Sequence, residues 1–217
     1  MGLHGDGARL AYPRVSTVDD VSEVVRRIRV LEVIDASACR LRTLRVFCSR
    51  SGRLIDVEGC RSCPSGGGVG PESVTCQMLS EPAGLGSNTP AALASEPYVT
   101  CARADVRAAA LMSVIAPPWL VPIIDEGDRF VGFVSSSSLA RSVWPSQALM
   151  SMRVRDFAFG SSLVVHETMT VREALHMMAN RRTRSVALVD SDGKLRGMLS
   201  DIDALRAFGA MGPPESV

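Results

Sequence analysis

Four cysteines in the first third of the chain have a spacing that could hold a metal ion. They follow the pattern Cys-x11-Cys-x2-Cys-x12-Cys and are Cys48, Cys60, Cys63 and Cys76. Four thiolates are enough for a tetrahedral zinc site, and the close Cys60/Cys63 pair is typical of a metal-binding turn. Zinc ribbons usually have two such close pairs, and this chain has one. The spacing predicts a structural zinc, with free buried thiols and a Cys-x-x-Cys redox couple as open alternatives.

Residue types that often act in catalysis are present without the partners they would need. His4, His166 and His176 have no Asp or Glu at catalytic spacing. The Gly-x-Ser-x-Gly nucleophile motif is absent, and no acid/base pair precedes Pro90. We therefore expect a protein that is not an enzyme.

Composition narrows the class of partner. Lys+Arg 24 against Asp+Glu 23 gives a net charge of +1, so no basic excess is available to hold a nucleic-acid backbone. The uncharged run from Ala108 to Ile124 contains Pro117, Pro118 and Pro122, which favours a buried helix, a break and a buried strand over a membrane span. Residues 1–12 lack a signal-peptide pattern, so a cytoplasmic location is expected.

The C-terminal half contains one segment twice, without a gap. A shift of 65 positions (197 − 132) superposes seven pairs of identical residues. These pairs are Val106/Val171, Ala109/Ala174, Met112/Met177, Val121/Val186, Asp125/Asp190, Gly132/Gly197 and Ser135/Ser200. A copy of about 50 residues is too small to bury a good core alone. We expect the two copies to pack face to face around a symmetric cleft, where function should be sought.

The second copy has the clearer pattern of elements. Leu163-Val164-Val165 predicts a short strand, and Thr170-Val171-Arg172-Glu173 is a capping box at the start of a helix that ends near Arg182. Two strands joined by a turn at residues 190–193 follow, and Ser200 then caps a last helix over residues 201–208. The order is β-α-β-β-α, which places the chain in the α/β (α+β) class.

This order of elements and its motifs resemble the cystathionine-β-synthase (CBS) domain family. The motifs are Thr170-Val171-x-x-Ala174, Ser185-Val186-Ala187-Leu188-Val189-Asp190-x-x-Gly193 and Gly197-x-x-Ser200-x-x-Asp203. The tandem arrangement is similar to a CBS pair, or Bateman module, over about residues 90–210. Such pairs are regulatory sensors that bind adenosine-containing ligands, commonly AMP, ADP or ATP, between the copies.

The resemblance assigns roles to particular residues. It implies that Ser200 contacts phosphate and that Asp203 holds the ribose hydroxyls, which suits a carboxylate that accepts two hydrogen bonds. Arg184 is placed to add positive charge, and the chain around Val165 and Val186 would enclose the base. Together with Gly197 these residues form the expected nucleotide site, and CBS pairs also commonly form homodimers through their helices.

The first copy departs from the family pattern. Gly132-x-x-Ser135-x-x-Ser138 has a serine where the ribose-binding Asp belongs, so one nucleotide per chain is expected, on the second copy's side. A structural alternative stays open for the second copy as well. Ser200 could cap the last helix, with Asp203 on its solvent-facing side.

The chain before the repeats is harder to assign. Residues 18–34 mix helical and strand patterns, Leu44–Phe47 and Arg53–Val57 predict strands, and Pro64–Pro71 predicts a flexible loop. The expected division is 1–44, a segment of uncertain structure; 45–80, a small Cys-rich and possibly zinc-binding module; 81–90, a linker; 91–147, repeat 1; 148–210, repeat 2; and 211–217, a tail.

The sequence thus predicts a regulatory protein that binds an adenine nucleotide in the cleft of a CBS pair and acts on an unidentified protein partner. Two alternatives remain. One is a structural homodimerisation module with degenerate ligand sites. The other is a redox or zinc N-terminal module that the pair regulates.

Overall fold

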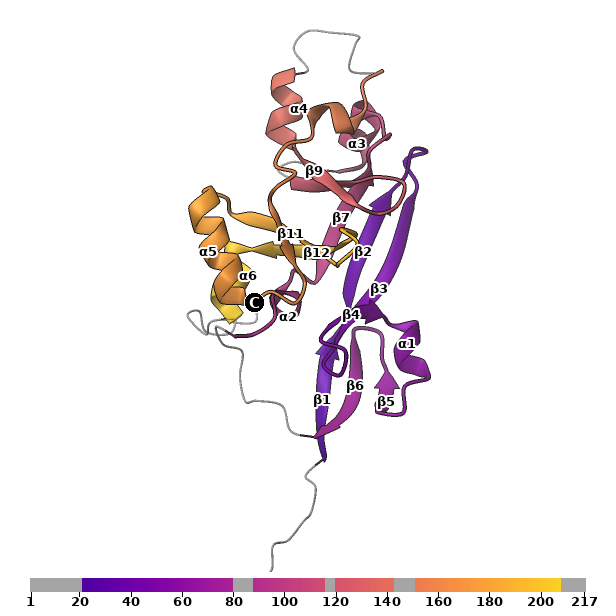
Figure 1. Ribbon diagram of the computed structural model, residues 1–217. Coiled ribbons are helices and arrows are strands. Elements are labelled where there is room, and N and C mark those ends of the chain that lie inside the picture. Colours follow the sequence, from indigo (N-terminus) through magenta and orange to yellow (C-terminus); the bar gives the residue numbers. More distant parts are fainter. Residues whose placement is uncertain (1–20, 80–87, 116–119, 143–150, 208–217) are drawn as a thin grey trace, which may run out of the picture.

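The fold is described from a computed structural model, which covers residues 21–79, 88–115, 120–142 and 151–207. Within these ranges the chain forms three β-sheets with short helices against them. Figure 1 shows the helices α3 and α4 at one end of the molecule and the strands β1, β5 and β6 at the other. The predicted mixed α/β class with tandem β-α-β-β-α units is confirmed.

The first copy supplies half of a six-stranded sheet. Its elements are β7 (Tyr98–Arg103), α3 (Ala108–Val114), β8 (Leu120–Ile124), β9 (Phe130–Ser135) and α4 (Ser136–Ser142). Strand β7 pairs in parallel with β8, which pairs antiparallel with β9. A parallel pair needs a crossover, and α3 provides it.

The second copy repeats this arrangement in a three-stranded sheet. Its elements are the 3-10 helix η2 (Val154–Phe157), β10 (Val164–His166), α5 (Val171–Arg181), β11 (Ser185–Val189), β12 (Leu195–Ser200) and α6 (Asp201–Ala207). The shift of 65 positions carries β8, β9 and α4 onto β11, β12 and α6, residue for residue. The duplication read from the sequence is therefore a duplication of structure.

The two copies meet sheet against sheet. The core between them takes Val99, Ile124 and Phe133 from the first copy and Ala187 and Met198 from the second. The turns of the two copies also bond to each other, because Phe130 N–H donates to the Gly193 carbonyl. The expected face-to-face packing is confirmed.

Each copy buries its other sheet face under its own helices. In the second copy, Val186 and Leu188 lie in this helix-facing core with residues of α5 and α6, whereas Ala187 between them faces the first copy. This alternation is the two-residue period of a strand that is buried on both sides. The helix α5 begins with the predicted capping box, in which Glu173 N–H donates to Thr170 Oγ1 at 3.3 Å and Thr170 N–H to Glu173 Oε2 at 2.9 Å.

The N-terminal strands extend the sheet of the first copy. They are β2 (Arg29–Ile34), β3 (Arg40–Cys48) and β4 (Arg53–Asp56), and the sheet order is β4-β3-β2-β7-β8-β9. Strand β2 pairs in parallel with β7, with Leu31 opposite Val99. The strands predicted near residues 44–47 and 53–57 are confirmed, and the predicted domain boundary at residues 44/45 falls inside β3.

A separate sheet carries most of the cysteine module. Its order is β1-β6-β5, from β1 (Val21–Arg27), β5 (Gly66–Val69) and β6 (Ser73–Leu79), and the short helix α1 (Glu58–Arg61) precedes β5. The prediction of a flexible loop over Pro64–Pro71 is wrong, because residues 66–69 form β5. Glycine lacks apolar surface to bury, but its backbone groups pair with β6, which fixes the segment without a core.

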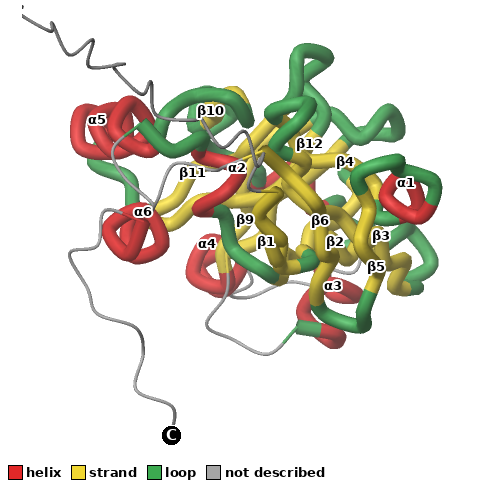
Figure 2. Tube along the Cα trace, turned by 90° about the horizontal axis from the view of Figure 1, so that it is seen from below, coloured by secondary structure: helices red, strands yellow, loops and turns green. Residues whose placement is uncertain are grey.

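The helices are short and lie on opposite sides of the strands. Helices α5 and α6 cover one side, together with α2 (Ala91–Ala94), and α1 lies on the other (Figure 2). No helix in the described ranges is long and apolar enough to cross a bilayer. The apolar run from Ala108 divides into α3 and β8 as expected, with residues 116–119 outside the described part.

Candidate nucleotide-binding site

Ser200 and Asp203 meet at the start of α6. Asp203 N–H donates to Ser200 Oγ at 3.2 Å, so Ser200 caps the helix as predicted. The Ser200 hydroxyl in turn donates to Asp203 Oδ2. The pair therefore forms one hydrogen-bonded unit, with the carboxylate held in place by its own helix start.

Two arginines flank this unit. Arg206 Nη1 lies 3.5 Å from Asp203 Oδ1, and Arg184 Nε lies 3.0 Å from Asp201 Oδ2. Strand pairing places Ser185 opposite Ser200, which is why Arg184 reaches the first turn of α6. Its side chain is 79% exposed, so it can move toward a ligand at little cost.

The opposite wall is the segment that leads from α2 into β7. Glu96 N–H donates to the Met198 carbonyl at 2.9 Å, which joins the first copy's entry segment to β12. Burial raises the pKa of Glu96 to about 7, and the charge of Asp203 adds to the effect.

The N-terminal extension braces this wall. Arg29 Nε donates to Ser95 Oγ at 2.7 Å, and Ser95 Oγ donates to the Ala92 carbonyl at 2.8 Å. The Arg29 guanidinium is mostly buried, and this burial lowers its pKa to about 10, with the charges of Arg27 and Arg26 adding to it. It remains a cation at neutral pH, because that pKa still lies well above 7.

Gly197 and its equivalent Gly132 differ in how closely the facing segment approaches them. A β-carbon built at Gly197 would lie 3.8 Å from Ser95 Cβ, an ordinary contact. At the equivalent Gly132 a β-carbon would lie 2.9 Å from the Phe159 carbonyl oxygen. Phe159 and Phe133 also exchange both backbone hydrogen bonds, so the entry segment of the second copy closes directly over β9. The facing segment therefore lies closer to Gly132 than to Gly197.

The first copy lacks the carboxylate, as its sequence indicates. Ser138 occupies the place of Asp203, and its N–H donates to Ser135 Oγ at 3.0 Å. Ser135 N–H donates back to Ser138 Oγ at 3.1 Å. The same cap is made here by two serines, without an anionic group to accept a ribose diol.

The side chains of Val165 and Val186, around which the chain was expected to enclose the base, are both buried, at 1% and 0% exposure, in the helix-facing core of the second copy. They point away from the first copy, because alternate residues of a strand face opposite sides. Of the predicted residues, Ser200, Asp203 and Arg184 meet around the start of α6, and Gly197 lies on β12 just before it. Their role in binding a nucleotide stays a prediction.

Two of the four cysteines of the spacing pattern share one small core. Cys60 and Cys76 belong to a cluster with Ile28, Val46 and Val74. Burial raises the pKa of Cys60, and the charges of Cys76, Cys48 and Cys63 add to it. A β-carbon at Gly66 would lie 2.9 Å from the Cys60 carbonyl and 3.1 Å from that of Cys63, so this turn is tight.

Cys48 differs from the other thiols. Burial opposes its ionisation, but hydrogen bonds from the Ser51 side chain and from the Ser51 and Arg50 backbone outweigh burial and lower its pKa. In the described part of the chain, no three His, Cys, Asp or Glu side chains are arranged to hold a metal ion as they stand. The predicted zinc site therefore gains no support from the arrangement of the thiols.

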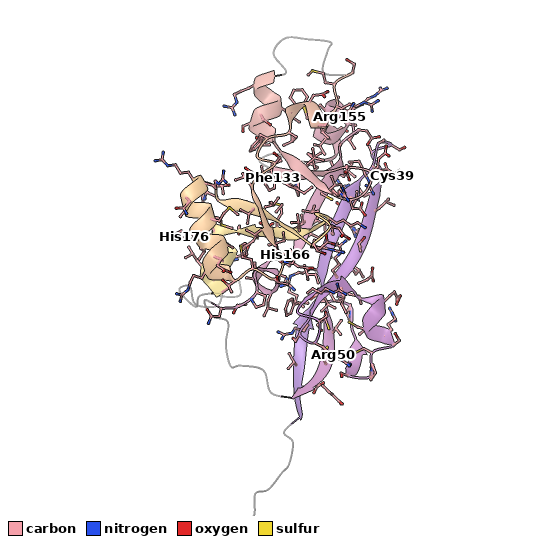
Figure 3. All side chains as sticks on the ribbon, viewed as in Figure 1. Cys39, Arg50, Phe133, Arg155, His166 and His176 are labelled. Atoms are coloured by element: carbon pink, nitrogen blue, oxygen red, sulfur yellow. The ribbon has the colours of Figure 1, made fainter. Side chains whose placement is uncertain are left out.

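A polar cavity lies elsewhere, between the β3–β4 hairpin and the second copy. Its volume is about 510 Å³, and its lining includes Arg53, His166, Asp190 and Arg196. Glu167, also in its wall, is 3% exposed and accepts the Leu54 N–H at 2.9 Å. His176 belongs to α5, apart from His166 (Figure 3).

A comparison with known protein families identifies the second copy. The family model of the CBS domain matches residues 154–210, which contain η2, β10, α5, β11, β12 and α6. Residues 154–210 form a CBS domain. Since the first copy has the same elements in the same order, the chain has the fold of a CBS domain pair with an N-terminal extension.

The chain is also similar to solved structures. The CBS domain of a bacterial CNNM/CorC-family Mg²⁺ transporter in complex with ATP has a TM-score of 0.50 at 17% identity and covers 58% of this chain and 91% of that chain. CBSX2 in complex with AMP has a TM-score of 0.47 at 23% identity and covers 54% of this chain and 94% of that one.

One curated relative matches only a part of this chain. Protein SDS23 of Candida albicans is 28% identical over 88 residues, which are 36% of this chain. The matched region spans 14% of the length of that relative.

Glu96, Ser95 and Arg29 lie beside β12, which leads into the candidate site, and no motif of the sequence indicates them. The 65-residue repeat is the sequence feature that could have indicated these residues. Phe133 and Met198 are equivalent under the 65-residue shift, and each bonds the segment that enters the other copy, at Phe159 and Glu96 respectively. The residues before the first strand of one copy therefore belong to the cleft of the other.

Proposed function

We propose that this protein is a non-enzymatic regulatory CBS domain pair that binds an adenine nucleotide beside Ser200 and Asp203. The observation that carries the proposal is the Ser200–Asp203 unit at the start of α6. Asp203 would accept the ribose hydroxyls, and the exposed Arg184 would turn toward the phosphate. The related transporter CBS domain in complex with ATP has the same fold and supports an adenine ligand.

The N-terminal extension gives this sensor a way to pass on a signal. Arg29 of β2 holds Ser95 beside the site, and Leu54 of β4 bonds Glu167 of the second copy. A ligand that shifts the entry segment of β7 would therefore shift the N-terminal strands. A regulated protein partner would read that change on the extension.

The direct test is calorimetric titration of the full chain with adenosine, AMP, ADP and ATP, supported by thermal unfolding. A ligand that binds only the native state adds about 2.7 kcal/mol of stability at 100 times its Kd. We expect saturable binding of one adenosine ligand per chain. Failure of all four ligands to bind or to stabilise the protein would overturn the proposed function and favour a purely structural pair.

Homodimerisation is a second part of the proposal, favoured by exposed apolar residues on α6. Ile202 is 41% and Leu205 42% exposed on the helix that carries Asp203. We predict a dimer that Leu205→Glu dissociates, because a buried unpaired carboxylate is costly at an apolar interface. Leu41→Glu on β3 is the control, since Leu41 is 57% exposed on a strand. Light scattering that gives the chain mass of 23.2 kDa for the wild type would contradict this prediction.

Zinc binding by Cys48, Cys60, Cys63 and Cys76 is a separate proposal, which rests on their spacing and on the core that Cys60 and Cys76 share. Protein purified without chelators is then expected to contain about one zinc per chain. Cys60→Ser should release the metal and loosen the β1-β6-β5 sheet, whereas Cys39→Ser should do neither, because Cys39 is exposed and outside the cluster. Elemental analysis without zinc, with all thiols reacting freely in the native protein, would leave the module metal-free.

A further inference from the structure

The polar cavity between the β3–β4 hairpin and the second copy is a further candidate binding site. It lies at the end of β12 that carries Arg196, whereas Ser200 lies at the other end of that strand. Its volume of about 510 Å³ is typical of small-molecule sites, which commonly form where two parts of a protein meet. The N-terminal extension supplies one wall and the second copy the other, so neither part forms the cavity alone.

Glu167 places a buried carboxylate in this cavity. The residue is only 3% exposed, and its Oε2 accepts the Leu54 N–H at 2.9 Å. No ion pair and no other side-chain hydrogen bond of Glu167 occurs among the residues that the structure describes. Its Oε1 is not sealed inside the protein either, because Arg26 Nε is the only fully buried polar side-chain atom without a partner in the described ranges. Oε1 therefore faces the cavity that Glu167 lines.

The backbone holds this carboxylate in place. Glu167 N–H donates to the Val189 carbonyl at 2.9 Å, and the Glu167 carbonyl accepts the Ala92 N–H at 3.2 Å. Together with the Leu54 bond, these contacts fix Glu167 between β11, α2 and β4. A buried carboxylate is costly unless a cation pairs with it. The fixed position and the missing counter-charge together indicate a cation from outside the chain.

The charges around the cavity have the same sign. Four carboxylates and two guanidinium groups line it, namely Asp56, Glu167, Asp190 and Asp192 against Arg53 and Arg196, which gives a net charge of 2 − 4 = −2 with neutral histidine. Arg196 forms an ion pair with Asp190, so Arg53 alone stands against the other three carboxylates. His166, the one histidine of the lining, bonds Thr168 Oγ1 through Nδ1 at 2.7 Å, and its protonation would still leave −2 + 1 = −1. The lining therefore favours a cation and repels an anion.

The cavity suits an organic cation better than a metal ion. Within the described ranges, no three His, Cys, Asp or Glu side chains are arranged to hold a metal ion. The volume leaves room for a carbon chain besides the charged group, and Leu54 and Ile55 are apolar residues of the same lining.

We propose that this cavity binds an aliphatic organic cation whose ammonium group donates a hydrogen bond to Glu167. An ammonium group has three donors, so it can bond Glu167 Oε1 and a further acceptor of the lining. A cation bound here would join β4 to the second copy. The site is separate from Ser200 and Asp203, so the inference goes beyond the proposed function and does not depend on it.

The test is calorimetric titration of the full chain with the diamine cadaverine, with the dicarboxylate glutarate as the control ligand. The two molecules have carbon chains of the same length and opposite terminal charges. We expect saturable binding of one cadaverine per chain and no binding of glutarate. If glutarate binds as tightly as cadaverine, or if cadaverine does not bind, the inference is wrong.

Glu167→Gln tests the role of the buried carboxylate. The amide oxygen of glutamine can still accept the Leu54 N–H, so this variant loses the charge and keeps the wall. The affinity for cadaverine should fall by roughly 10- to 100-fold, the loss expected for a charge-assisted hydrogen bond. Glu72→Gln, at an exposed position between β5 and β6, is the matched control and should bind cadaverine like the wild type.

Asp192→Asn is a second variant, which tests the charge of the lining even if Glu167→Gln does not fold. Asp192 is exposed, and its carboxylate accepts no hydrogen bond in the described part of the chain, so the fold should be unaffected. A loss of about two- to fivefold in cadaverine affinity is expected, the range for an exposed charge pair.

The outcomes decide the class of ligand. Unchanged affinity in folded Glu167→Gln, or in Asp192→Asn where Glu167→Gln does not fold, would overturn the inference. Magnesium chloride that binds the wild type, displaces cadaverine and fails to bind Glu167→Gln would identify a metal site and overturn it as well. Each of these results is independent of nucleotide binding at Asp203.

Discussion

Asp203→Ala is expected to weaken binding of an adenine nucleotide by about 30- to 100-fold, because it removes charge-assisted hydrogen bonds worth roughly 2–3 kcal/mol. Ser138→Ala, at the equivalent position of the first copy, should leave the affinity unchanged. The contrast follows from chemistry: a carboxylate can accept both hydrogens of a ribose diol, and the serine at position 138 belongs to a helix cap. Calorimetric titration of the wild type, Asp203→Ala and Ser138→Ala with the nucleotide measures these affinities.

The same variants separate ligand binding from helix capping. In Asp203→Ala the backbone N–H of residue 203 still has Ser200 Oγ as its acceptor, so the cap of α6 survives. The ion pair with Arg206 is lost, but exposed pairs contribute at most about 1 kcal/mol. Unfolding free energies should therefore remain close to wild type. Equal affinity in wild type and Asp203→Ala would remove Asp203 from the site.

The duplicated half of the fold was predictable because its signals are local. Each strand of the second copy has a short apolar run, and Thr170 with Glu173 marks the start of α5 in four residues of sequence. The constant shift then transfers every element to the first copy, where the pattern is weaker. Two copies with one apolar sheet face each can bury those faces against each other, so their packing follows as well.

The N-terminal extension was not predictable because its pairings are distant in sequence. Strand β2 pairs with β7, with Val30 opposite Tyr98, and β1 pairs with β6, with Val24 opposite Cys76. Nothing in residues 18–34 identifies those partners. The strand at Gly66–Val69 was even less predictable. Glycine-rich sequence favours loops, and only backbone pairing with β6 makes this segment a strand.

The sequence predicts the helix-start residues of the candidate site but not the residues around them. Ser200 and Asp203 lie in one motif, three residues apart, so local spacing brings them together. The side chains of Val165 and Val186 are buried, and a strand buried on both sides has no polar residue to indicate which face is which. Glu96 comes from a segment about a hundred residues before Met198, and only the folded pair brings its backbone N–H to β12.

Phe133→Ala should be the most destabilising of the substitutions considered, because Phe133 fills the core where the two copies meet. Its side chain is fully buried, and its ring contacts that of Phe130 edge-on at 4.9 Å between centroids. The core around it includes Ala187, Leu195 and Met198 of the second copy. Truncating a buried phenylalanine costs about 3–5 kcal/mol, a large part of the total stability of an ordinary domain.

Phe159→Ala is the matched control for this effect. Phe159 pairs with Phe133 through two backbone hydrogen bonds, and its ring centroid lies 6.5 Å away, but it is 46% exposed. Its truncation should cost no more than about 1.5 kcal/mol, the upper value for one aromatic contact. Urea denaturation of the three proteins measures the difference. If Phe133→Ala cost no more than Phe159→Ala, the packing of the two copies would not depend on this core.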